Sequence, residues 1–552
     1  MAAVALLHAL DYLRITFPVK GPMKAFLQSS LLRKFLNYKR IVHERLRPGD
    51  LIHGIQHDTF DLIEFGYINF LKLLKAVCEL FFLLGFKVTY PLLIGVSYDV
   101  KAFAILFSTP VFLAVFVVCR QRTTMGALRT KNDQHNEVTN EIQMLTAGYH
   151  LVIDYNLRDH FERRFQEKRR RYTLAIQQAD QVLMNDVYFC TWCTSLSTAA
   201  YVLYGGLQVI NGSLSVGLFV TNIRLFKSAG RGFLTIYTLT IGMMQTFPGL
   251  VNITTVMNYP TDQKQRAHIN RHQQAEATAS RERMLQKRWG DADEIPIDTM
   301  AIVLNSNCPF KYEGHETALN LRGHVSFDQG QLVAVIGRLG CGKATLLHLI
   351  ACSVLPEEGR ESPIFIPPHL RVANVADEPI FFSGSLYDNL TLGMDTSQQG
   401  ASRERVKSIC KRLTKSDIIT DYMERNEEAP WFDLFSKSQC KLLSIARALV
   451  HNVEVLTIHK PLARLSHEDC VHLTEAFHAH IADKGLDLIA DKAHRRPRTI
   501  IISAVRASDK AVREASQVIL VDPIHGVRSL ETILETGSEP DRGDLGITLS
   551  KR

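Results

Sequence analysis

The pattern of apolar and polar positions predicts membrane helices in the first half of the chain. Residues 102–119 form an uncharged, apolar run between Lys101 and Arg120, and its length is just sufficient for one helix to cross a bilayer. Residues 76–96 are also apolar and carry only two charges. A short polar loop separates the two runs, so together they predict a helical hairpin.

Two further stretches predict a second pair of spans. No charged residue occurs in 187–222 or in 232–261, and a turn is expected between the two predicted helices, within VINGSLSVG. We therefore expect spans over residues 187–210 and 217–245, which brings the number of spans to about four.

Three basic residues interrupt the last predicted span. Arg224, Lys227 and Arg231 lie at i, i+3 and i+7, which places them on one face of a helix. Charges inside a membrane are typical of a functional site, here one for an anionic substrate or a lipid phosphate. Snorkelling of the side chains toward the membrane surface is the alternative explanation.

Residues 120–186 lie between the two hairpins and are rich in Lys and Arg, whereas the opposite turns carry almost none. By the charge-bias rule, this stretch faces the compartment from which the protein was inserted. Its amphipathic, helical pattern predicts membrane helices that continue well beyond the bilayer.

The apolar pattern changes after residue 260. Residues 261–295 are rich in Gln, Arg, Glu and Ala, and from about 296 short apolar strands alternate with helical patterns, as in an α/β domain. The expected domains are a transmembrane domain over 1–260, a polar helical linker over 261–295, an α/β domain over 296–536 and a polar tail over 537–552.

Composition narrows the class of protein. The 552 residues are 46% hydrophobic and carry a net charge of +8, with no basic stripe of the kind that binds nucleic acid, so we expect no nucleic-acid partner. Ten scattered cysteines favour reduced thiols over a disulfide framework. His268 and His272 lack a nearby third ligand, and we expect no metal site.

The start of the α/β domain contains a phosphate-binding pattern. The apolar segment QLVAVIG leads into GRLGCGKATLLHLI, which fits a strand, a glycine loop and a helix. Gly337, Gly340 and Gly342 allow backbone N–H groups to approach phosphate oxygens, and Lys343 adds a charge. The next residue is Ala344, where a magnesium-binding Ser or Thr is expected, and Thr345 follows one place late.

With these motifs the chain resembles an ATP-binding cassette (ABC) transporter, specifically an exporter-type half-transporter of the multidrug-resistance kind, and the resemblance covers most of the chain. In the family's order, residues 375–393 resemble the glutamine-loop region, 435–449 the signature motif and its helix, and 499–508 the switch-histidine strand. Residues 47–71 and 210–226 resemble parts of the family's membrane domain.

The chain departs from the family pattern at its catalytic motifs. His459 and Lys460 stand where the resemblance implies the magnesium-binding aspartate and the catalytic glutamate. Asp377 replaces the glutamine of the glutamine loop, and Val505 replaces the switch histidine. The signature reads FSKSQ, with its two glycines replaced.

These departures predict a cassette with no catalytic residue and no metal ligand, so we expect a pseudo-ATPase rather than an active enzyme. Hydrolysis needs a metal and a base that this chain lacks. Weak, magnesium-independent binding of ATP or another nucleotide is the expected chemistry, and an empty pocket retained for folding is the alternative. The resemblance implies the following nucleotide-binding candidates: Tyr312, as the stacking aromatic, Gly337, Gly340, Gly342, Lys343, Thr345, Ser436 and Gln439.

Two functions remain open from the sequence. The chain is expected to be the non-hydrolysing half of a heterodimeric exporter, with a second ABC half-transporter as partner. The alternative is a structural subunit of a larger complex, for example in the mitochondrial inner membrane. Membrane lipids are expected partners in either case.

The family has six spans, so this membrane domain is expected to be truncated. The first fifty residues are apolar and basic, which fits a mitochondrial presequence or an amphipathic surface helix.

Overall fold

The structure is a computed structural model of the whole chain. It describes residues 19–46, 48–94, 100–287, 299–307, 309–312, 318–356, 364–395, 399–414, 416–425, 427–489, 492–504 and 510–530. The chain forms two compact units, Met1–Thr261 and Asp262–Arg552.

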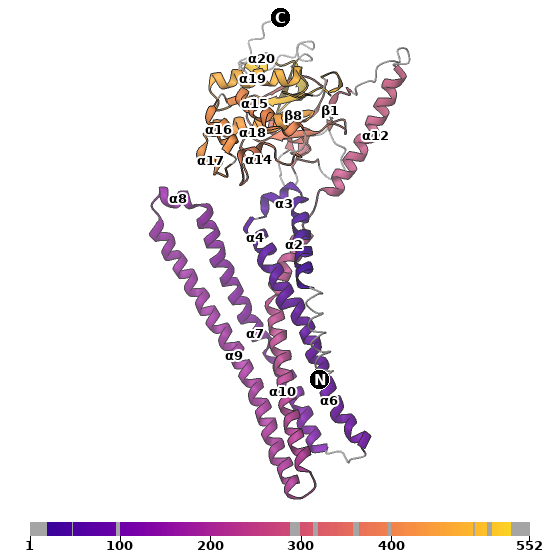
Figure 1. Ribbon diagram of the computed structural model, residues 1–552, viewed down its shortest axis with the longest axis vertical. Coiled ribbons are helices and arrows are strands. Elements are labelled where there is room, and N and C mark those ends of the chain that lie inside the picture. Colours follow the sequence, from indigo (N-terminus) through magenta and orange to yellow (C-terminus); the bar gives the residue numbers. More distant parts are fainter. Residues whose placement is uncertain are drawn as a thin grey trace. The chain divides into compact units, whose positions relative to one another are not determined.

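The first unit is helical throughout its described part (Figure 1). Its elements are α2 (Lys20–Leu36), α3 (Arg40–Arg45), α4 (Pro48–His53), the π-helical turn η1 (Gly54–Asp58), α5 (Thr59–Asp61), the π-helical turn η2 (Leu62–Tyr67), α6 (Ile68–Ile94), α7 (Val100–Ala147), α8 (Tyr149–Asp154), α9 (Arg158–Ile210), α10 (Val216–Gln245) and α11 (Phe247–Asn258). We call this part the helical unit.

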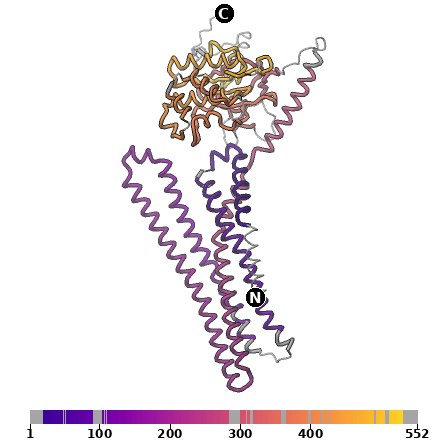
Figure 2. The backbone as a smooth tube through the Cα atoms, viewed as in Figure 1, coloured from indigo at the N-terminus to yellow at the C-terminus, as the bar shows by residue number. Residues whose placement is uncertain are grey.

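The expected long helices are confirmed. α7 and α9 continue far beyond their apolar runs, and the short helix α8 joins them, as the backbone trace in Figure 2 shows. Three of the four predicted spans fall within α7, α9 and α10, and the first, over 76–96, lies in α6 as far as Ile94. Residues 95 and 96 lie outside the described residues. Within the described residues, only Phe103–Ala147 of α7 contains a stretch long and apolar enough to cross a bilayer, and little of it is buried. The number of spans therefore stays a prediction.

A buried carboxylate connects three of these helices. Asp186 of α9 is 1% exposed and accepts hydrogen bonds from Arg120 Nε (2.8 Å) and Thr124 Oγ1 (2.9 Å) of α7. It also accepts one from the Tyr237 hydroxyl of α10, at 2.8 Å. Because a buried charge without partners is strongly destabilising, these donors fix the register of the three helices.

The second unit contains a six-stranded sheet in the order β11-β10-β5-β9-β8-β7. Neighbouring strands from β10 to β7 are parallel, and β11 is antiparallel at the edge. The strands of this sheet are β5 (Leu332–Ile336), β7 (Val372–Val375), β8 (Val455–Ile458), β9 (Thr499–Ser503), β10 (Gln517–Asp522) and β11 (Gly526–Ser529).

Smaller sheets and helices complete this α/β unit. A three-stranded sheet has the order β4-β1-β6, and β2 pairs with β3. These strands are β1 (Ile302–Ser306), β2 (Phe310–Lys311), β3 (Ala318–Leu319), β4 (Gly323–Phe327) and β6 (Ile364–Phe365). The helices are α12 (Gln263–Lys287), α13 (Lys343–Ile350), α14 (Leu386–Leu390), α15 (Arg403–Thr414), α16 (Asp417–Arg425), α17 (Trp431–Leu434), α18 (Lys437–His451), α19 (His467–Ala482) and α20 (Lys510–Arg513), with 3₁₀ turns at Gln399–Ala401 and Lys492–His494.

The central strand β5 explains why its sequence is apolar without interruption. Leu332, Ala334 and Ile336 point into one hydrophobic core, and Val333 and Val335 point into a second core on the opposite face of the sheet. A parallel strand covered on both faces has no polar side, so the apolar run QLVAVIG predicted it correctly. The predicted strands within RTIIISAV and SQVILVD are likewise confirmed, as β9 and β10.

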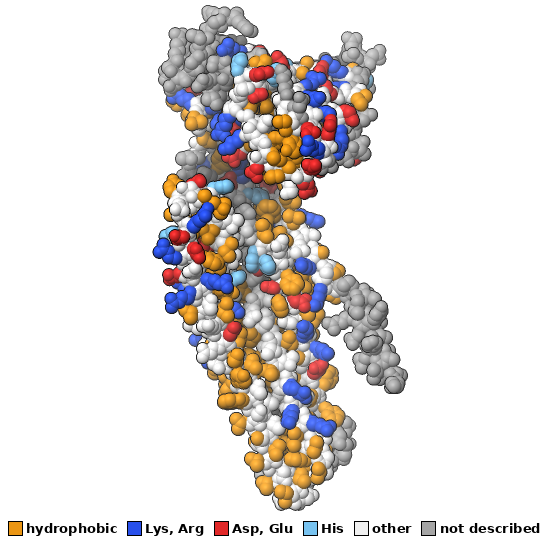
Figure 3. Space-filling model, turned by 60° about the vertical axis from the view of Figure 1, so that its left-hand side comes forward, with side chains coloured by type: hydrophobic (Ala, Val, Ile, Leu, Met, Phe, Trp, Pro, Cys, Tyr) orange, Lys and Arg blue, Asp and Glu red, His pale blue; other side chains and the backbone are white. Residues whose placement is uncertain are grey.

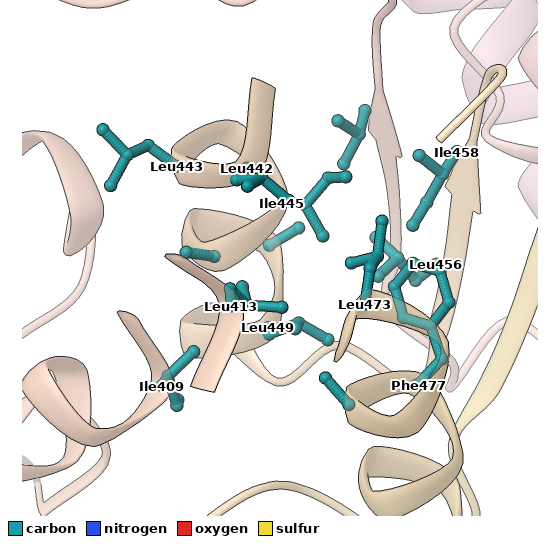
Figure 4. Close-up of a cluster of buried hydrophobic side chains, with 14 of the residues drawn as sticks. Ile409, Leu413, Leu442, Leu443, Ile445, Leu449, Leu456, Ile458, Leu473 and Phe477 are labelled. Atoms are coloured by element: carbon teal, nitrogen blue, oxygen red, sulfur yellow. The ribbon is translucent and has the colours of Figure 1, made fainter. Parts of the chain in front are cut away.

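The larger core lies between the sheet and the helices that carry the signature-like segment (Figure 4). α18 and α19 turn their apolar faces toward β8, and α15 packs against α18 on the far side. Figure 4 labels Ile409, Leu413, Leu442, Leu443, Ile445, Leu449, Leu456, Ile458, Leu473 and Phe477. This core fixes where β8 ends and where α18 begins.

The predicted polar linker over 261–295 is helical in its described part, as α12. Its side chains donate hydrogen bonds to carbonyl oxygens of the α/β unit, from Arg266 to Cys352 (2.8 Å) and from Gln273 to Ile364 (3.4 Å). The predicted polar tail over 537–552 lies outside the described residues.

We expect Phe477→Ala to lower the free energy of unfolding of the α/β unit by about 3–5 kcal/mol, because the side chain is 0% exposed and its removal leaves a cavity. The measurement is chemical denaturation of the purified chain, followed by far-UV circular dichroism. Glu475→Ala, at an exposed position of the same helix, is the control and should change stability by less than about 0.5 kcal/mol. Equal effects of the two substitutions would contradict this packing.

Candidate functional site

The glycine loop follows β5 directly and leads into α13. Gly337 has a φ of 153°, and a Cβ at this position would lie 2.3 Å from the carbonyl oxygen of Val521. Gly342 immediately precedes α13 with a φ of 101°. No other residue type fits these two positions without strain. The loop therefore turns tightly at the carboxyl end of the central strand, where its backbone N–H groups and the start of α13 can meet an anion.

The ammonium group of Lys343 lies inside this loop. Its Nζ donates hydrogen bonds to the carbonyl oxygens of Gly337 (2.5 Å) and Arg338 (2.7 Å), and the residue is 6% exposed. Burial lowers the pKa of Lys343, and the nearby charge of Lys460 lowers it further, while the Cys341 thiol opposes the shift. An anion in the loop would relieve both unfavourable effects.

Tyr312 and Thr345, which the sequence analysis proposed separately, are brought together. The Tyr312 hydroxyl donates a hydrogen bond to Thr345 Oγ1 at 2.8 Å. Thr345 is buried and lies in the first turn of α13, whereas Tyr312 is half-buried. The tyrosine is thus fixed next to the glycine loop, and the threonine hydroxyl is already hydrogen bonded.

His459 follows the last residue of β8. Its Nδ1 lies 2.8 Å from the Ser503 hydroxyl at the end of β9, and its backbone N–H donates to the carbonyl oxygen of Val375. Burial lowers the pKa of the imidazole, and the Lys460 charge adds to this effect, while Asp377 acts in the opposite direction. The histidine is therefore neutral at neutral pH.

Lys441 of α18 connects the segments that follow β7 and β8. Its ammonium group is 2.9 Å from Asp377 Oδ1 and donates to the carbonyl oxygens of Lys460 (2.6 Å) and Ala463 (3.4 Å). Lys441 is 5% exposed. A buried lysine with a carboxylate and two carbonyl partners holds these segments in one arrangement.

The charge of Asp377 is accordingly retained. Burial alone would raise the pKa of its carboxyl group, but the hydrogen bond and charge of Lys441, together with His459 and Lys460, lower it below its usual value. Asp377 is therefore an ionised carboxylate that already has a cationic partner.

The signature-like residues begin α18. Ser436 is the N-cap: its side chain accepts a hydrogen bond from the Gln439 N–H, and Gln439 Oε1 accepts one from the Ser436 N–H, which forms a capping box. Lys437 is the first residue of the helix, and the Ser438 hydroxyl donates to the Arg464 carbonyl oxygen at 2.7 Å. Ser436 and Gln439 thus lie together, and no hydrogen bond within the described residues joins them to the glycine loop.

Two contributors to this site were missed by the sequence analysis. Lys441 is one basic residue in an amphipathic helix, and Ser503 is one hydroxyl at the end of an apolar strand, so neither had a local signal. The opposite charges of Asp377 and Lys441 are the one sequence feature that fits this pair. They indicate a contact only when the structure shows that the end of β7 lies next to α18. The switch position Val505 lies outside the described residues. Within the described ranges, no group of three or more His, Cys, Asp or Glu residues is arranged to hold a metal ion.

Comparison with protein families gives two matches. The profile of the ABC transporter transmembrane region matches residues 27–228, in the helical unit. The ABC transporter profile matches residues 322–463, in the α/β unit, which include the glycine loop, α18 and β8.

Curated relatives align mainly over a smaller part of the chain. The spermidine/putrescine import ATP-binding protein PotA of Bacteroides fragilis is 31% identical over 172 residues, which are 30% of this chain and 35% of PotA. ABC multidrug transporter E of Aspergillus fumigatus is 28% identical over 251 residues, which are 40% of this chain and 19% of the relative. The chain thus spans about a third or less of the length of these relatives.

A solved structure shares the fold over nearly the whole chain. A bacterial Atm1-family ABC exporter with ATP bound has a TM-score of 0.71 and 18% sequence identity, over 96% of this chain and 86% of the exporter chain. At this identity the similarity shows the fold. The helical unit is therefore an exporter-like transmembrane domain, and the α/β unit is an ATP-binding cassette. The chain belongs to the ABC transporter family and is an integral membrane protein.

Proposed function

We propose that this chain is an exporter-type ABC half-transporter that binds ATP without hydrolysing it, as the inactive partner of a hydrolysing chain. The arrangement at the end of β8 carries the proposal: a neutral imidazole and a lysine stand there, and the neighbouring carboxylate of Asp377 is paired with Lys441.

The residues present suit a nucleotide. The loop from Gly337 to Gly342 offers backbone N–H groups at the start of α13, and Lys343 supplies a buried positive charge. Tyr312 lies beside the loop, where an aromatic ring would stack on a base. Lys460 adds a second cation, and its charge lowers the pKa of Lys343.

The residues present do not suit magnesium. Ala344 has no oxygen ligand, and the Thr345 hydroxyl accepts a hydrogen bond from Tyr312. His459 and Lys460 replace the oxygen ligands that magnesium prefers, and Asp377 is engaged by Lys441. We infer that Lys343 and Lys460 neutralise the phosphates directly, so nucleotide binding is weak and independent of magnesium.

Hydrolysis is not supported by this set of side chains. Attack on the γ-phosphate needs a positioned water and charge neutralisation by a metal, and a general base alone contributes about 10²- to 10⁴-fold to the rate. The Lys460 ammonium cannot accept a proton, and no carboxylate is hydrogen bonded to it or to His459 within the described residues. Asp377 is paired with Lys441 instead.

A second candidate function is a structural subunit of a larger membrane complex, for which the mitochondrial inner membrane is the first location to examine. The capping box favours it: Ser436 and Gln439 already satisfy each other's groups, and the Lys437 side chain occupies a position where a glycine would admit a partner's nucleotide.

We expect the native chain to bind ATP equally well in EDTA and in magnesium, because its own lysines neutralise the phosphates. Lys343→Met and Lys460→Met should each weaken binding by about tenfold, equivalent to about 1.4 kcal/mol. The measurement is the dissociation constant of ATP, determined by isothermal titration calorimetry with the detergent-purified chain. Lys411→Met, at an exposed position of α15, is the matched control. No binding in EDTA, or equal losses in all three variants, would contradict this site.

Restoring oxygen ligands should create a metal response. We expect the triple variant Ala344→Ser, His459→Asp and Lys460→Glu to bind ATP at least about tenfold more tightly when magnesium is added. The native chain and Ala344→Ser alone should not respond. Magnesium-stimulated binding, or ATP hydrolysis by the native chain in a phosphate-release assay, would refute the pseudo-ATPase proposal.

The two candidate roles differ in their partners. Mild detergent extraction of the native membrane and affinity purification of this chain should recover one stoichiometric ABC chain with an aspartate and a glutamate at the end of its own β8 equivalent. Recovery of many unrelated membrane subunits in fixed ratio would replace the half-transporter proposal with the structural one.

A further inference from the structure

A hollow of about 580 Å³ opens on the helical unit between α9 and α10. α9 contributes small and hydroxyl-bearing side chains, among them Ser195, and the apolar side chains of Val202 and Leu203. α10 contributes a single cation, Lys227. The hollow therefore combines one charged group with a mainly apolar wall.

The hollow lies at the depth of the most apolar part of the unit. A neighbouring gap is lined by Pro110 of α7 together with Phe226 and Phe233 of α10. Pro110 is midway along the uncharged run 102–119, within the helix that is apolar enough to cross a bilayer. Lys227 follows Phe226 directly, so its backbone is near the middle of the apolar layer.

This depth argues against simple snorkelling. α10 begins at Val216, eleven residues before Lys227. At about 1.5 Å per residue this separation is about 16 Å along the helix axis, which is further than a lysine side chain extends. The ammonium group needs a counter-charge at its own depth.

That counter-charge is not supplied by the described residues. Arg224, Lys227 and Arg231 are exposed, and no side-chain hydrogen bond or ion pair joins any of them to another residue in the described part of the chain. Two other basic side chains near the apolar layer do have partners: Arg120 pairs with Asp186, and Lys87 donates to Asn222 Oδ1 at 2.6 Å. Figure 3 shows basic side chains among hydrophobic ones in the end of the helical unit away from the α8 turn. Charges in a membrane without partners are costly and mark functional positions.

The hydroxyl groups in the hollow limit which donors can bind a ligand. Thr194 and Thr198 donate their protons to the carbonyl oxygens of Cys190 (2.9 Å) and Thr194 (2.8 Å). The Lys227 ammonium and the Ser195 hydroxyl are then the donors left for a ligand. Both match an oxyanion, and the apolar wall formed by Val202 and Leu203 matches a hydrocarbon chain.

We propose that this hollow binds an anionic amphiphile through its phosphate head group. Lys227 pairs with the phosphate, Ser195 donates to it, and Arg224 and Arg231 add positive charge on the same face of α10. Hydrocarbon lies along Val202 and Leu203. The proposal requires that the helical unit lie in a membrane, but it is independent of nucleotide binding.

Native mass spectrometry of the delipidated full chain tests the proposal. Dioleoyl phosphatidic acid should bind at least about tenfold more tightly than dioleoyl phosphatidylcholine. Lys227→Met should remove this preference, and Lys227→Arg should keep it. Lys75→Met, which removes an exposed positive charge from α6, is the matched control and should leave the preference unchanged.

Three outcomes would overturn the proposal: equal binding of the two lipids, a preference that survives in Lys227→Met, or equal losses in Lys227→Met and Lys75→Met. Inorganic phosphate should not compete at lipid-like concentrations, and competition there would identify a free anion as the ligand instead. Lys227→Gln provides a second neutral variant if Lys227→Met does not fold. ATP binding in EDTA, measured on the same variants, should be unchanged, so failure of the nucleotide site and failure of this site are distinguishable.

Discussion

The arrangement of the cassette's site depends on the ammonium group of Lys441. Its partners are the Asp377 carboxylate after β7 and the carbonyl oxygens of Lys460 and Ala463 after β8. Because Lys441 is 5% exposed, loss of any partner would leave a buried charge poorly compensated. The contact ties α18 to the segments that follow two strands of the sheet. It also engages the Asp377 carboxylate, whose charge acts on His459.

Electrostatics around the glycine loop follow from this pairing. The charge of Lys460 lowers the pKa of Lys343, burial and the same charge lower the pKa of His459, and Asp377 is an ionised carboxylate paired with Lys441. The loop therefore has an excess of positive charge and no free carboxylate among these residues. On our proposal this site binds a phosphate without a metal, whereas the usual nucleotide site shares that task with magnesium.

Two buried carboxylates of the helical unit, Asp186 and Glu141, are also compensated by partners. Asp186 is satisfied by Arg120, Thr124 and Tyr237, and Glu141, at 2% side-chain exposure, pairs with Arg164 and Lys168. These contacts connect α7, α9 and α10 where apolar packing alone would permit sliding. The cations of α10 have no such partner among the described residues, and for this reason we propose a ligand rather than a structural role for the hollow beside Lys227.

Periodicity and motif spacing in the sequence determined the elements and the family. Uninterrupted apolar runs predicted β5, β9 and β10, because strands covered on both faces have no polar side, and the amphipathic pattern of 120–186 predicted the extensions of α7 and α9. The glycines at 337, 340 and 342 predicted the loop, since all three adopt backbone conformations that other residues rarely reach. Tertiary structure alone decided that Asp377 meets Lys441, that Tyr312 holds Thr345, and that Lys227 faces a hollow at the depth of Pro110. Local sequence carries signals over a few residues, whereas these contacts join segments brought together only when the sheet and the helices pack.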